Sequence, residues 1–238
     1  MKVTRIEDVH QLTFYSPVLP INVQLIEKEL GLVLIDAGLK QNAADILTYI
    51  EAQDRPLLAI LLTHAHGDHV GGVDTILKAH PHAELYVSRR DARLLEGDRK
   101  TDPDERSLKI KGSLPTIRSL PDKLLDPGER LFGLRVYAAA GHTPGSIAYF
   151  DEQHRLLFAG DAFQSHGGVA VAGDTRPLFP LPGLATWDKS AAVDHAERLL
   201  DLAPRHTFVG HGKALEGTHR LYLALKRAQR KQARRFSR

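Results

Sequence analysis

The sequence contains no cysteine, and only one methionine and one tryptophan among 238 residues. The absence of cysteine excludes disulfides, thiolate nucleophiles and every zinc site that uses a thiolate ligand. Long apolar runs are also missing. The longest, such as residues 57–62, fall far short of the roughly 18–20 residues that a membrane span requires. Any metal bound by this chain must therefore rest on histidine and carboxylate, and no membrane partner is expected.

The first eight residues carry acids before any apolar stretch, which differs from the order of a secretory signal, so we expect a cytoplasmic location. With 42% hydrophobic and 26% charged residues, the composition is that of a globular protein. The length fits one large α/β domain or two small ones, and we predict a single domain over residues 1–238. The oligomeric state is left open.

The net charge of +3 hides a basic tail. The last 19 residues hold eight basic and no acidic side chains, whereas the remainder has 24 basic and 29 acidic ones, a net charge of −5. We predict that the tail, at about 213–238, is helical. Such a charge cluster can bind phosphate backbones or acidic surfaces, but a solvated helix end is the more common role.

Apolar periodicity predicts strands that alternate with helices. The expected strands are 23–26, 31–38, 57–62, 84–88, 134–138, 146–150, 155–158 and 207–209. The expected helices are 41–53, 73–79, 189–202 and the tail from 218 onward. The segments 96–121 and 163–187 are rich in charge, glycine or proline, which favours loops that border a site.

Five of the 13 histidines and two aspartates stand beside glycine or at predicted strand ends. They are His64, His66, Asp68, His69, His142, Asp161 and His211. These seven side chains suffice for two metal ions. Imidazole and carboxylate ligands suit zinc, with iron or manganese as alternatives, whereas calcium or magnesium would require a mostly oxygen site.

The His-x-His-x-Asp-His spacing at residues 64–69 favours a non-helical loop, in which alternate side chains reach one metal and the Asp-His pair reaches another. The helical zinc motif, with histidines four residues apart around a glutamate, is absent. The histidines outside the motifs are expected on the surface or in packing, with His166 as the one nearest the site. For Trp187 and Phe179 two interpretations stay open, a hydrophobic lip over the site or simple loop packing.

Four motifs, in order, resemble those of the metallo-β-lactamase superfamily over about residues 21–212. They are Leu62-Thr63-His64-Ala65-His66-Gly67-Asp68-His69-Val70-Gly71-Gly72, Ala140-Gly141-His142-Thr143-Pro144-Gly145-Ser146, Phe158-Ala159-Gly160-Asp161 and Val209-Gly210-His211-Gly212. The early segment Leu34-Ile35-Asp36-Ala37-Gly38 is similar to the family's early strand. The resemblance implies an α/β fold, a four-layer αββα sandwich of two mixed β-sheets with helices on the outer faces.

The resemblance also implies the role of each ligand. His64, His66 and His142 would bind a first metal, and Asp68, His69 and His211 a second. Asp161 would bridge them, and Asp36 would orient a metal-bound imidazole. Two divalent ions lower the pKa of a shared water toward ~7, so a bridging hydroxide would attack the substrate while Asp68 helps to move the proton.

Differences from known branches narrow the expected substrate. Glyoxalase II proteins carry a helical glutathione-binding extension after the last ligand, where only 26 residues follow Gly212. Acyl-homoserine lactonases commonly place tyrosine three residues after the bridging aspartate, where this chain has Gln164. Exported β-lactamases lack the bridging aspartate, and flavodiiron proteins have glutamate where Ala65 stands. The prediction is a metal-dependent hydrolase that cleaves an ester, lactone or thioester of a small molecule.

Two alternatives come from other classes. The basic tail favours a nuclease or phosphodiesterase of the same fold, although nucleic acid is the less expected partner. The second alternative is a mononuclear iron oxidoreductase similar to a persulfide dioxygenase. It would use one iron and consume oxygen, so metal analysis separates it from a hydrolase.

Overall fold

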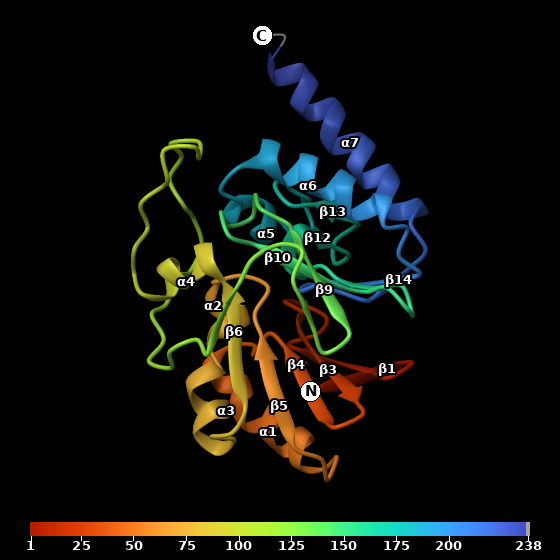
Figure 1. The fold of residues 1–238 in the computed structure, drawn as a ribbon. Helices are drawn as coiled ribbons and strands as arrows, with labels where there is room; N and C mark the ends of the chain where they lie inside the picture. The colour runs from red at the N-terminus through yellow and green to blue at the C-terminus, as the bar shows by residue number, and fades with distance from the viewer. Residues whose placement is uncertain (237–238) are drawn as a thin grey trace. The chain divides into compact units, whose positions relative to one another are not determined.

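The computed structural model describes residues 1–236, so Ser237 and Arg238 of the predicted tail lie outside the described residues. The chain forms two compact units, shown in Figure 1 and described in turn. The N-terminal unit comprises residues 1–99 and 113–126, and the C-terminal unit comprises residues 100–112 and the chain from residue 127. The single domain over residues 1–238 stays a prediction.

The N-terminal unit, all of whose residues are described, contains a seven-stranded sheet whose spatial order follows the chain. Its strands are β1 (Lys2–Ile6), β2 (Val9–Phe14), β3 (Ile21–Lys28), β4 (Gly31–Ile35), β5 (Leu57–Leu61), β6 (Glu84–Ser88) and β7 (Lys123–Leu125). Neighbours from β1 to β4 are antiparallel, and those from β4 to β7 are parallel. Short turns suffice for the antiparallel pairs, whereas the parallel pairs need long crossovers.

The strands expected within β3 to β6 are confirmed, but β1, β2 and β7 were not predicted. In β2 every residue is buried although His10, Gln11 and Thr13 interrupt its apolar pattern. Two of these side chains find partners within the unit, since Thr13 donates to Asn22 Oδ1 at 2.8 Å and His10 Nδ1 lies 3.0 Å from the Tyr49 hydroxyl. Hydrogen bonds to neighbouring elements allow these polar side chains to be buried. The strand therefore lacks the period-2 pattern that identifies a half-buried strand.

Helices connect the parallel strands of this unit. They are the 3-10 turn η1 (Lys40–Asn42), α1 (Ala43–Glu51), α2 (Gly67–Val70), α3 (Val73–Ala79) and α4 (Arg89–Leu95). The predicted helices at 41–53 and 73–79 are confirmed, and they lie side by side in Figure 1. Residues 96–122, all within the described part of the chain, form no helix or strand, as expected for most of that segment.

The C-terminal unit has a mixed sheet with the order β15-β14-β11-β10-β9-β8 among its described residues. Its strands are β8 (Arg130–Leu131), β9 (Leu134–Ala138), β10 (Ile147–Asp151), β11 (Leu156–Phe158), β14 (His206–Phe208) and β15 (Leu215–Glu216). A separate ribbon pairs β12 (Phe163–Gln164) with β13 (Ala170–Val171). Only β11 and β14 are parallel, and the other pairs are antiparallel.

Two long helices pack beside each other in this unit, α6 (Lys189–Asp201) and α7 (His219–Phe236), as Figure 1 shows. The shorter helices are η2 (Gly160–Ala162) and α5 (Leu181–Ala185). The apolar faces of α6 and α7, including Leu199 and Leu225, are buried in one cluster with strand residues such as Leu157 and Ala148. Burial of these faces, rather than helix propensity, stabilises both helices.

The basic tail forms most of α7, and part of its charge is paired with a buried carboxylate. Arg227 Nη2 lies 2.6 Å from Asp174 Oδ2, and Lys231 pairs with the other oxygen of the same carboxylate. The Asp174 side chain is 1% exposed. Two of the eight tail cations therefore anchor the helix, which the solvated-end interpretation did not anticipate.

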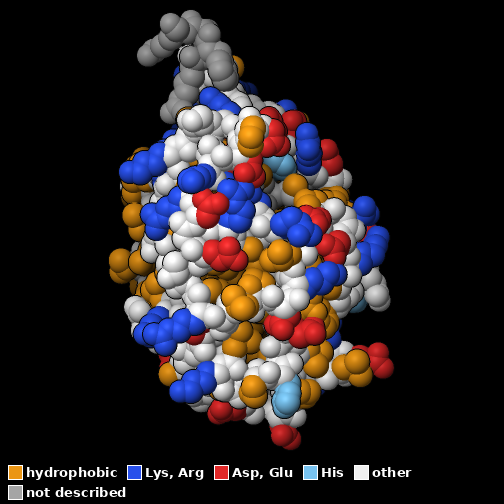
Figure 2. Space-filling model, turned by 60° about the vertical axis from the view of Figure 1, so that its left-hand side comes forward, with side chains coloured by type: hydrophobic (Ala, Val, Ile, Leu, Met, Phe, Trp, Pro, Cys, Tyr) orange, Lys and Arg blue, Asp and Glu red, His pale blue; other side chains and the backbone are white. Residues whose placement is uncertain are grey.

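The expected α/β fold with two mixed sheets and accompanying helices is confirmed. No helix within residues 1–236 is both long and apolar enough to cross a membrane. On the face shown in Figure 2, basic and acidic side chains are interspersed rather than gathered by sign.

Candidate metal centre

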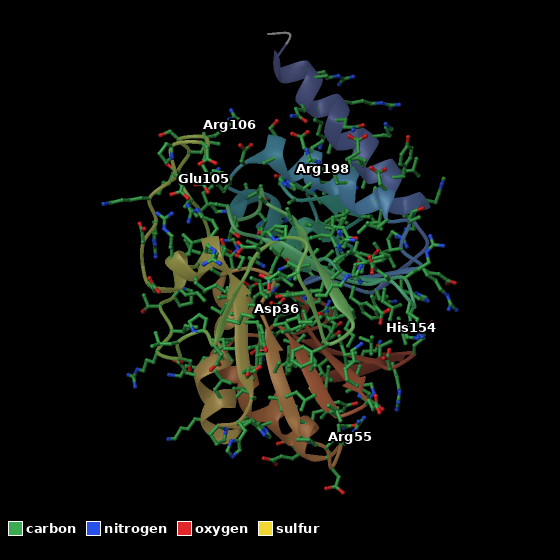
Figure 3. The ribbon with its side chains drawn as sticks, in the orientation of Figure 1. Asp36, Arg55, Glu105, Arg106, His154 and Arg198 are labelled. Atoms are coloured by element: carbon green, nitrogen blue, oxygen red, sulfur yellow. The ribbon has the colours of Figure 1, made fainter. Side chains whose placement is uncertain are left out.

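In the N-terminal unit, two neighbouring parallel strands deliver site residues to one edge of the sheet. The register pairs Ile35 of β4 with Leu61 of β5, and Asp36 and Thr63 follow at the carboxyl ends of these strands. Figure 3 marks Asp36 at this position. Its carboxylate accepts from the Thr63 N–H at 2.8 Å and from the Thr63 hydroxyl at 2.8 Å. This edge is where α/β sheets place their sites.

Asp36 has a backbone φ of +60°, a conformation that few residues other than glycine adopt. Aspartate tolerates it better than most residues because its short polar side chain bonds locally. The bonds to Thr63 and to His69 hold the side chain in place in return. The strained backbone conformation therefore belongs to a residue that orients a candidate ligand.

The histidines of the 64–69 segment form a compact group within this unit. The ring centroid of His64 lies 4.9 Å from that of His66 and 4.0 Å from that of His69. His64 Nδ1 faces the Thr63 hydroxyl at 3.0 Å, and His69 Nδ1 faces Asp36 Oδ2 at 2.7 Å. With Nδ1 held from behind, Nε2 of each ring is the atom available for a metal.

The predicted non-helical loop is wrong for the second half of the motif, because Gly67–Val70 forms the single helical turn α2. His66 precedes it with extended backbone, and its carbonyl accepts from the N–H groups of His69 and Val70. His64 and His66 thus lie on an extended segment, and the Asp68-His69 pair lies on the helical turn that follows it. His69 Nε2 lies 3.9 Å from Asp68 Oδ2, whose side chain is 29% exposed.

Asp91 supports this segment and was not predicted. It is fully buried on α4 and accepts from the Ala65 N–H at 2.9 Å, between the first two histidines. Its own N–H donates to Ser88, the N-cap of α4. A serine three residues before an acidic residue, directly after a strand, is a helix-start signal that could have revealed α4.

Two glycines allow the backbone to approach this segment closely. A Cβ on Gly72 would lie 2.3 Å from the Ala37 carbonyl oxygen, and one on Gly71 would lie 2.6 Å from the Lys40 nitrogen. Any side chain here would push the Asp36 loop away from the histidines. Gly71 and Gly72 therefore have a structural role with a steric cause.

In the C-terminal unit, two loops and the 3-10 turn η2 bring His142, Asp161 and His211 together. Asp161 Oδ2 lies 3.3 Å from His142 Nε2 and 3.2 Å from His211 Nε2. All three side chains are at least 96% buried. Asp161 and His211 follow the parallel neighbours β11 and β14, whose register pairs Phe158 with Phe208, so they emerge at the same edge. One carboxylate oxygen thus stands between two imidazoles.

A segment before α6 supports His142. The Thr186 hydroxyl lies 3.2 Å from His142 Nδ1 and donates to the Pro182 carbonyl at 2.8 Å. The Trp187 N–H donates to the His142 carbonyl at 3.0 Å. Thr186 was not predicted, because nothing in its sequence neighbourhood marks it and only the folded loop brings it to His142.

Aromatic and amide side chains surround His211. The Phe179 ring centroid lies 5.4 Å from that of His211 and 4.9 Å from that of His166, whose N–H donates to the His211 carbonyl at 3.2 Å. Gln164 donates to the carbonyls of His166 and Phe179 at 3.1 and 3.2 Å. His166 thus lies beside a candidate ligand, as expected. Phe179 and Trp187 are 3% and 6% exposed, which favours the packing interpretation.

Other histidines have packing or surface contacts, as predicted. His10 is 1% exposed, and its Nε2 lies 2.8 Å from Glu27. His154 pairs with Asp151 at 3.0 Å, and His195 Nδ1 lies 2.9 Å from the Ala191 carbonyl. These contacts account for the three side chains without a metal.

The residues of both units suit a divalent metal. Each unit contains buried imidazoles and at least one carboxylate, and the chain has no cysteine thiolate that could act as a ligand. Nδ1 of His64, His69 and His142 faces an oxygen of a neighbouring side chain, the arrangement that orients metal-bound imidazoles in proteins. Such a set is typical of zinc, iron or manganese sites and unlike the oxygen-rich sites of calcium.

The fold and these donors define a class, the metal-dependent hydrolases. Residues 16–211 match the model of the metallo-beta-lactamase superfamily. The chain belongs to this superfamily.

Relatives agree with this assignment. The chain is 42% identical to "Uncharacterized protein YobT" of Bacillus subtilis (strain 168), over 97% of this chain and 100% of that protein. It is 32% identical to "Probable metallo-hydrolase YflN" of the same organism, over 82% and 80%. It is also 35% identical to the hydroxyacylglutathione hydrolase of Aeromonas salmonicida (strain A449), over 61% of this chain and 47% of that enzyme. The chain thus spans about half of the latter's length.

A solved structure, TTHA1623 in a di-iron-bound form, is similar with a TM-score of 0.64 and 33% identity. The similarity covers 87% of this chain and 93% of that one. The chain is therefore a metal-dependent hydrolase by family, with a donor set suited to divalent metal.

Proposed function

We propose that this chain is a binuclear metal-dependent hydrolase that cleaves an ester, lactone or thioester bond of a small molecule. The observation that carries the proposal is the position of Asp161 Oδ2, within 3.3 Å of His142 Nε2 and 3.2 Å of His211 Nε2. A carboxylate between two imidazoles that belong to different metals is what a bridging ligand requires. This geometry lies wholly within the C-terminal unit.

The proposed ligand set divides by metal. His64, His66 and His142 hold the first ion, and Asp68, His69 and His211 hold the second, with Asp161 shared. We propose zinc at both positions, with iron favoured next because the similar TTHA1623 structure is described as di-iron-bound. Within the N-terminal unit, a ring nitrogen of His64 lies within 4.8 Å of one on His66 and one on His69, close enough for ligands of adjacent ions.

Bound divalent ions supply an activated water nucleophile and polarisation of the scissile carbonyl. The chain's own residues supply orientation and proton transfer. Asp36 and Thr63 fix the ring planes of His69 and His64, and Thr186 does the same for His142. Asp68 is the most exposed of the proposed carboxylate ligands, with 29% of its side chain exposed, so its carboxylate can take a proton from water and release it to solvent.

The relatives support the type of bond that is cleaved more than they support any particular substrate. The thioester class is supported by the hydroxyacylglutathione hydrolase, although only about half of that enzyme is matched. Gln164 occupies the position where related lactonases commonly have tyrosine, and it holds the carbonyls of His166 and Phe179. Since Gln164 is buried and engaged, we place substrate selection in the segments around it rather than on its amide.

A metal assay combined with a substrate panel tests the proposal. We expect two metal ions per chain and hydrolysis of a lactone, an aryl ester or a glutathione thioester. Asp68→Asn should lower kcat by about 100-fold or more, as is typical for loss of a general acid-base group. Asp45→Asn, on the exposed face of α1, is the matched control and should retain wild-type turnover.

Three outcomes would overturn the proposal. Full turnover in Asp68→Asn would exclude the proton-transfer role. One iron per chain with oxygen uptake would indicate the oxidoreductase alternative. Selective cleavage of a phosphodiester would indicate the nuclease alternative, whose binding should also weaken steeply with salt.

A further inference from the structure

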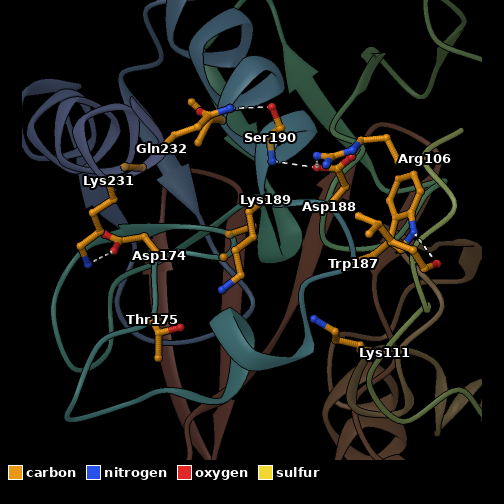
Figure 4. A pocket seen from close by; sticks show the side chains of 15 residues that line it. Arg106, Lys111, Asp174, Thr175, Trp187, Asp188, Lys189, Ser190, Lys231 and Gln232 are labelled. Carbon is orange, nitrogen blue, oxygen red and sulfur yellow. Dashed lines mark hydrogen bonds and ion pairs between the residues drawn. The ribbon is translucent and has the colours of Figure 1, made fainter. Parts of the chain in front are cut away.

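The C-terminal unit contains a cavity of about 480 Å³ that the proposed mechanism does not use. Its walls come from residues 106–111, residues 172–175, the start of α6 and the last turns of α7 (Figure 4). All of these segments belong to one compact unit. The volume is within the range of small-molecule sites, about 300–1,000 Å³.

The charges around this cavity are unbalanced toward positive. Four lining side chains are cationic and two are anionic. The cations are Arg106, Lys111, Lys189 and Lys231. The two carboxylates also make contacts of their own: Asp188 caps α6 and lies 3.2 Å from Arg106, and Asp174 pairs with Lys231 and Arg227. An anionic ligand would reduce the mutual repulsion of these cations.

The stem of Lys189 packs against a position that has no side chain, Gly173. Gly173 has a φ of +81°, and a Cβ there would lie 2.6 Å from Lys189 Cγ. The aliphatic stem of Lys189 therefore lies directly over the glycine. Figure 4 shows Lys189 and Lys111 extending toward the same open space from different walls.

The remaining wall is apolar. Trp187 lines the cavity, and its indole N–H donates to the Leu108 carbonyl at 3.1 Å. Val193 and Ala228, from α6 and α7, continue this surface. A site that combines cations with an aromatic ring and aliphatic groups matches an anion that carries an apolar body.

From the cavity, its cations and its apolar wall, we infer that this unit binds an organic anion, a molecule with one carboxylate or phosphate and an aliphatic body. Lys189 and Lys111 contact the anionic group, and Trp187 and Val193 contact the apolar part. The inference goes beyond the hydrolase proposal and does not depend on it. It also assigns the basic helix α7 a role, because Lys231 and Gln232 form part of the wall.

The only tryptophan of the chain lies in this cavity, so its fluorescence reports on the site directly. We would titrate the full, metal-loaded chain with decanoate, decyl phosphate and decyltrimethylammonium. A saturable change with decanoate or decyl phosphate is expected, and the tighter of the two identifies the anionic group. The cationic amphiphile should cause no saturable change.

Variants distinguish this site from other binding. Lys189→Gln and Lys111→Gln should each weaken the anion by about tenfold, as loss of a charge-assisted contact predicts. Lys226→Gln is the matched control, since Lys226 lies on α7 over the Tyr222 ring and does not line the cavity. Asp161→Asn, which removes a proposed metal ligand, should leave the anion affinity unchanged. Circular dichroism verifies folding of each variant.

The proposed anion site is overturned if neither anion changes the tryptophan signal, if the cation binds as well as the anions, or if Lys189→Gln and Lys111→Gln bind like Lys226→Gln. Loss of binding in Asp161→Asn with retention in both cavity-lysine variants would place the anion at the metal ligands instead. None of these results depends on substrate turnover.

Discussion

At the scale of single residues, the side chains behind the candidate ligands are the least obvious part of the site. Asp36 holds Thr63 and His69, Asp91 holds the Ala65 N–H, and Thr186 holds His142. Each is buried, so its polar atoms require the partners that it has. These residues set the direction in which the imidazoles present Nε2.

Asp36→Asn should lower metal affinity by about 10- to 100-fold, the usual cost of losing a group that orients a metal-bound imidazole. The amide has no charge to stabilise the His69 N–H, and one of its two acceptor atoms is lost. Competition with a chelator of known affinity measures the change. Asp45→Asn is the control on exposed α1. Equal affinities for the two variants would contradict the role given to Asp36.

Asp74 provides a pH-dependent test in the N-terminal unit. Partial burial raises the pKa of Asp74, but hydrogen bonds from the Ser119 and Arg118 N–H groups outweigh this and hold the pKa below its ordinary value. The carboxylate therefore stabilises the fold above about pH 4, and the contribution is lost as the pH falls through the lowered folded pKa.

Asp74→Ala should reduce the unfolding free energy by about 1–2 kcal/mol at pH 7, since hydrogen bonds to a partly exposed charge are lost. The difference from wild type should shrink at about pH 3. Urea unfolding at both pH values measures it, with Asp104→Ala in an exposed loop as the control. A difference that is the same at both pH values would show that the carboxylate charge is not its source.

At the scale of elements, the ends of parallel strands position the candidate ligands, and a buried carboxylate holds the last helix in place. Parallel pairs β4–β5 and β11–β14 each end beside each other, so residues distant in sequence emerge together. The helix α7 is anchored through Asp174, which is 1% exposed and holds both Arg227 and Lys231. Its position matters because three of its residues line the cavity.

Asp174→Asn should destabilise the C-terminal unit by about 2 kcal/mol. This is less than the 3–5 kcal/mol for a fully buried pair, because the Arg227 and Lys231 side chains are 33% and 54% exposed. Urea unfolding gives the free energy, and hydrogen exchange locates the loss to α7. Asp194→Asn, exposed on α6, is the control. Unchanged protection of the α7 amides would contradict the anchoring role.

Strongly patterned elements were predictable from sequence, and weakly patterned ones were not. The apolar run of β5 and the periodicity of α6 identified both. The strand β2 was missed because its buried polar residues find partners that only neighbouring elements supply. The turn α2 was missed because four residues are too few for a periodic signal.

At the scale of the whole molecule, the relevant properties are the distribution of charge and the expected dependence of stability on metal. The tail carries eight of the 32 basic residues, but its charge is not all available to a partner, since Arg227 and Lys231 are paired within the C-terminal unit. The candidate metal ligands are mostly buried, so we expect bound metal to stabilise the fold.

Removal of metal with a chelator should lower the unfolding free energy, by about 4 kcal/mol if the free metal had been at 1,000 times its dissociation constant. Asp161→Asn should show a much smaller loss on chelation, because the proposed bridging ligand is gone. Thermal unfolding with and without chelator measures both. An equal loss in wild type and Asp161→Asn would contradict a stabilising role for Asp161 through metal.

The sequence by itself determined the α/β class, most strands and long helices, and the seven candidate ligands, because apolar periodicity and short polar motifs are local properties of the chain. Only the tertiary structure decided which side chains stand behind those ligands and that a cationic cavity lies between α6, α7 and two loops. Asp91, Thr186 and Lys231 are ordinary polar residues in the sequence. Their roles arise from partners 26, 44 and 57 positions away, at separations that no local pattern encodes.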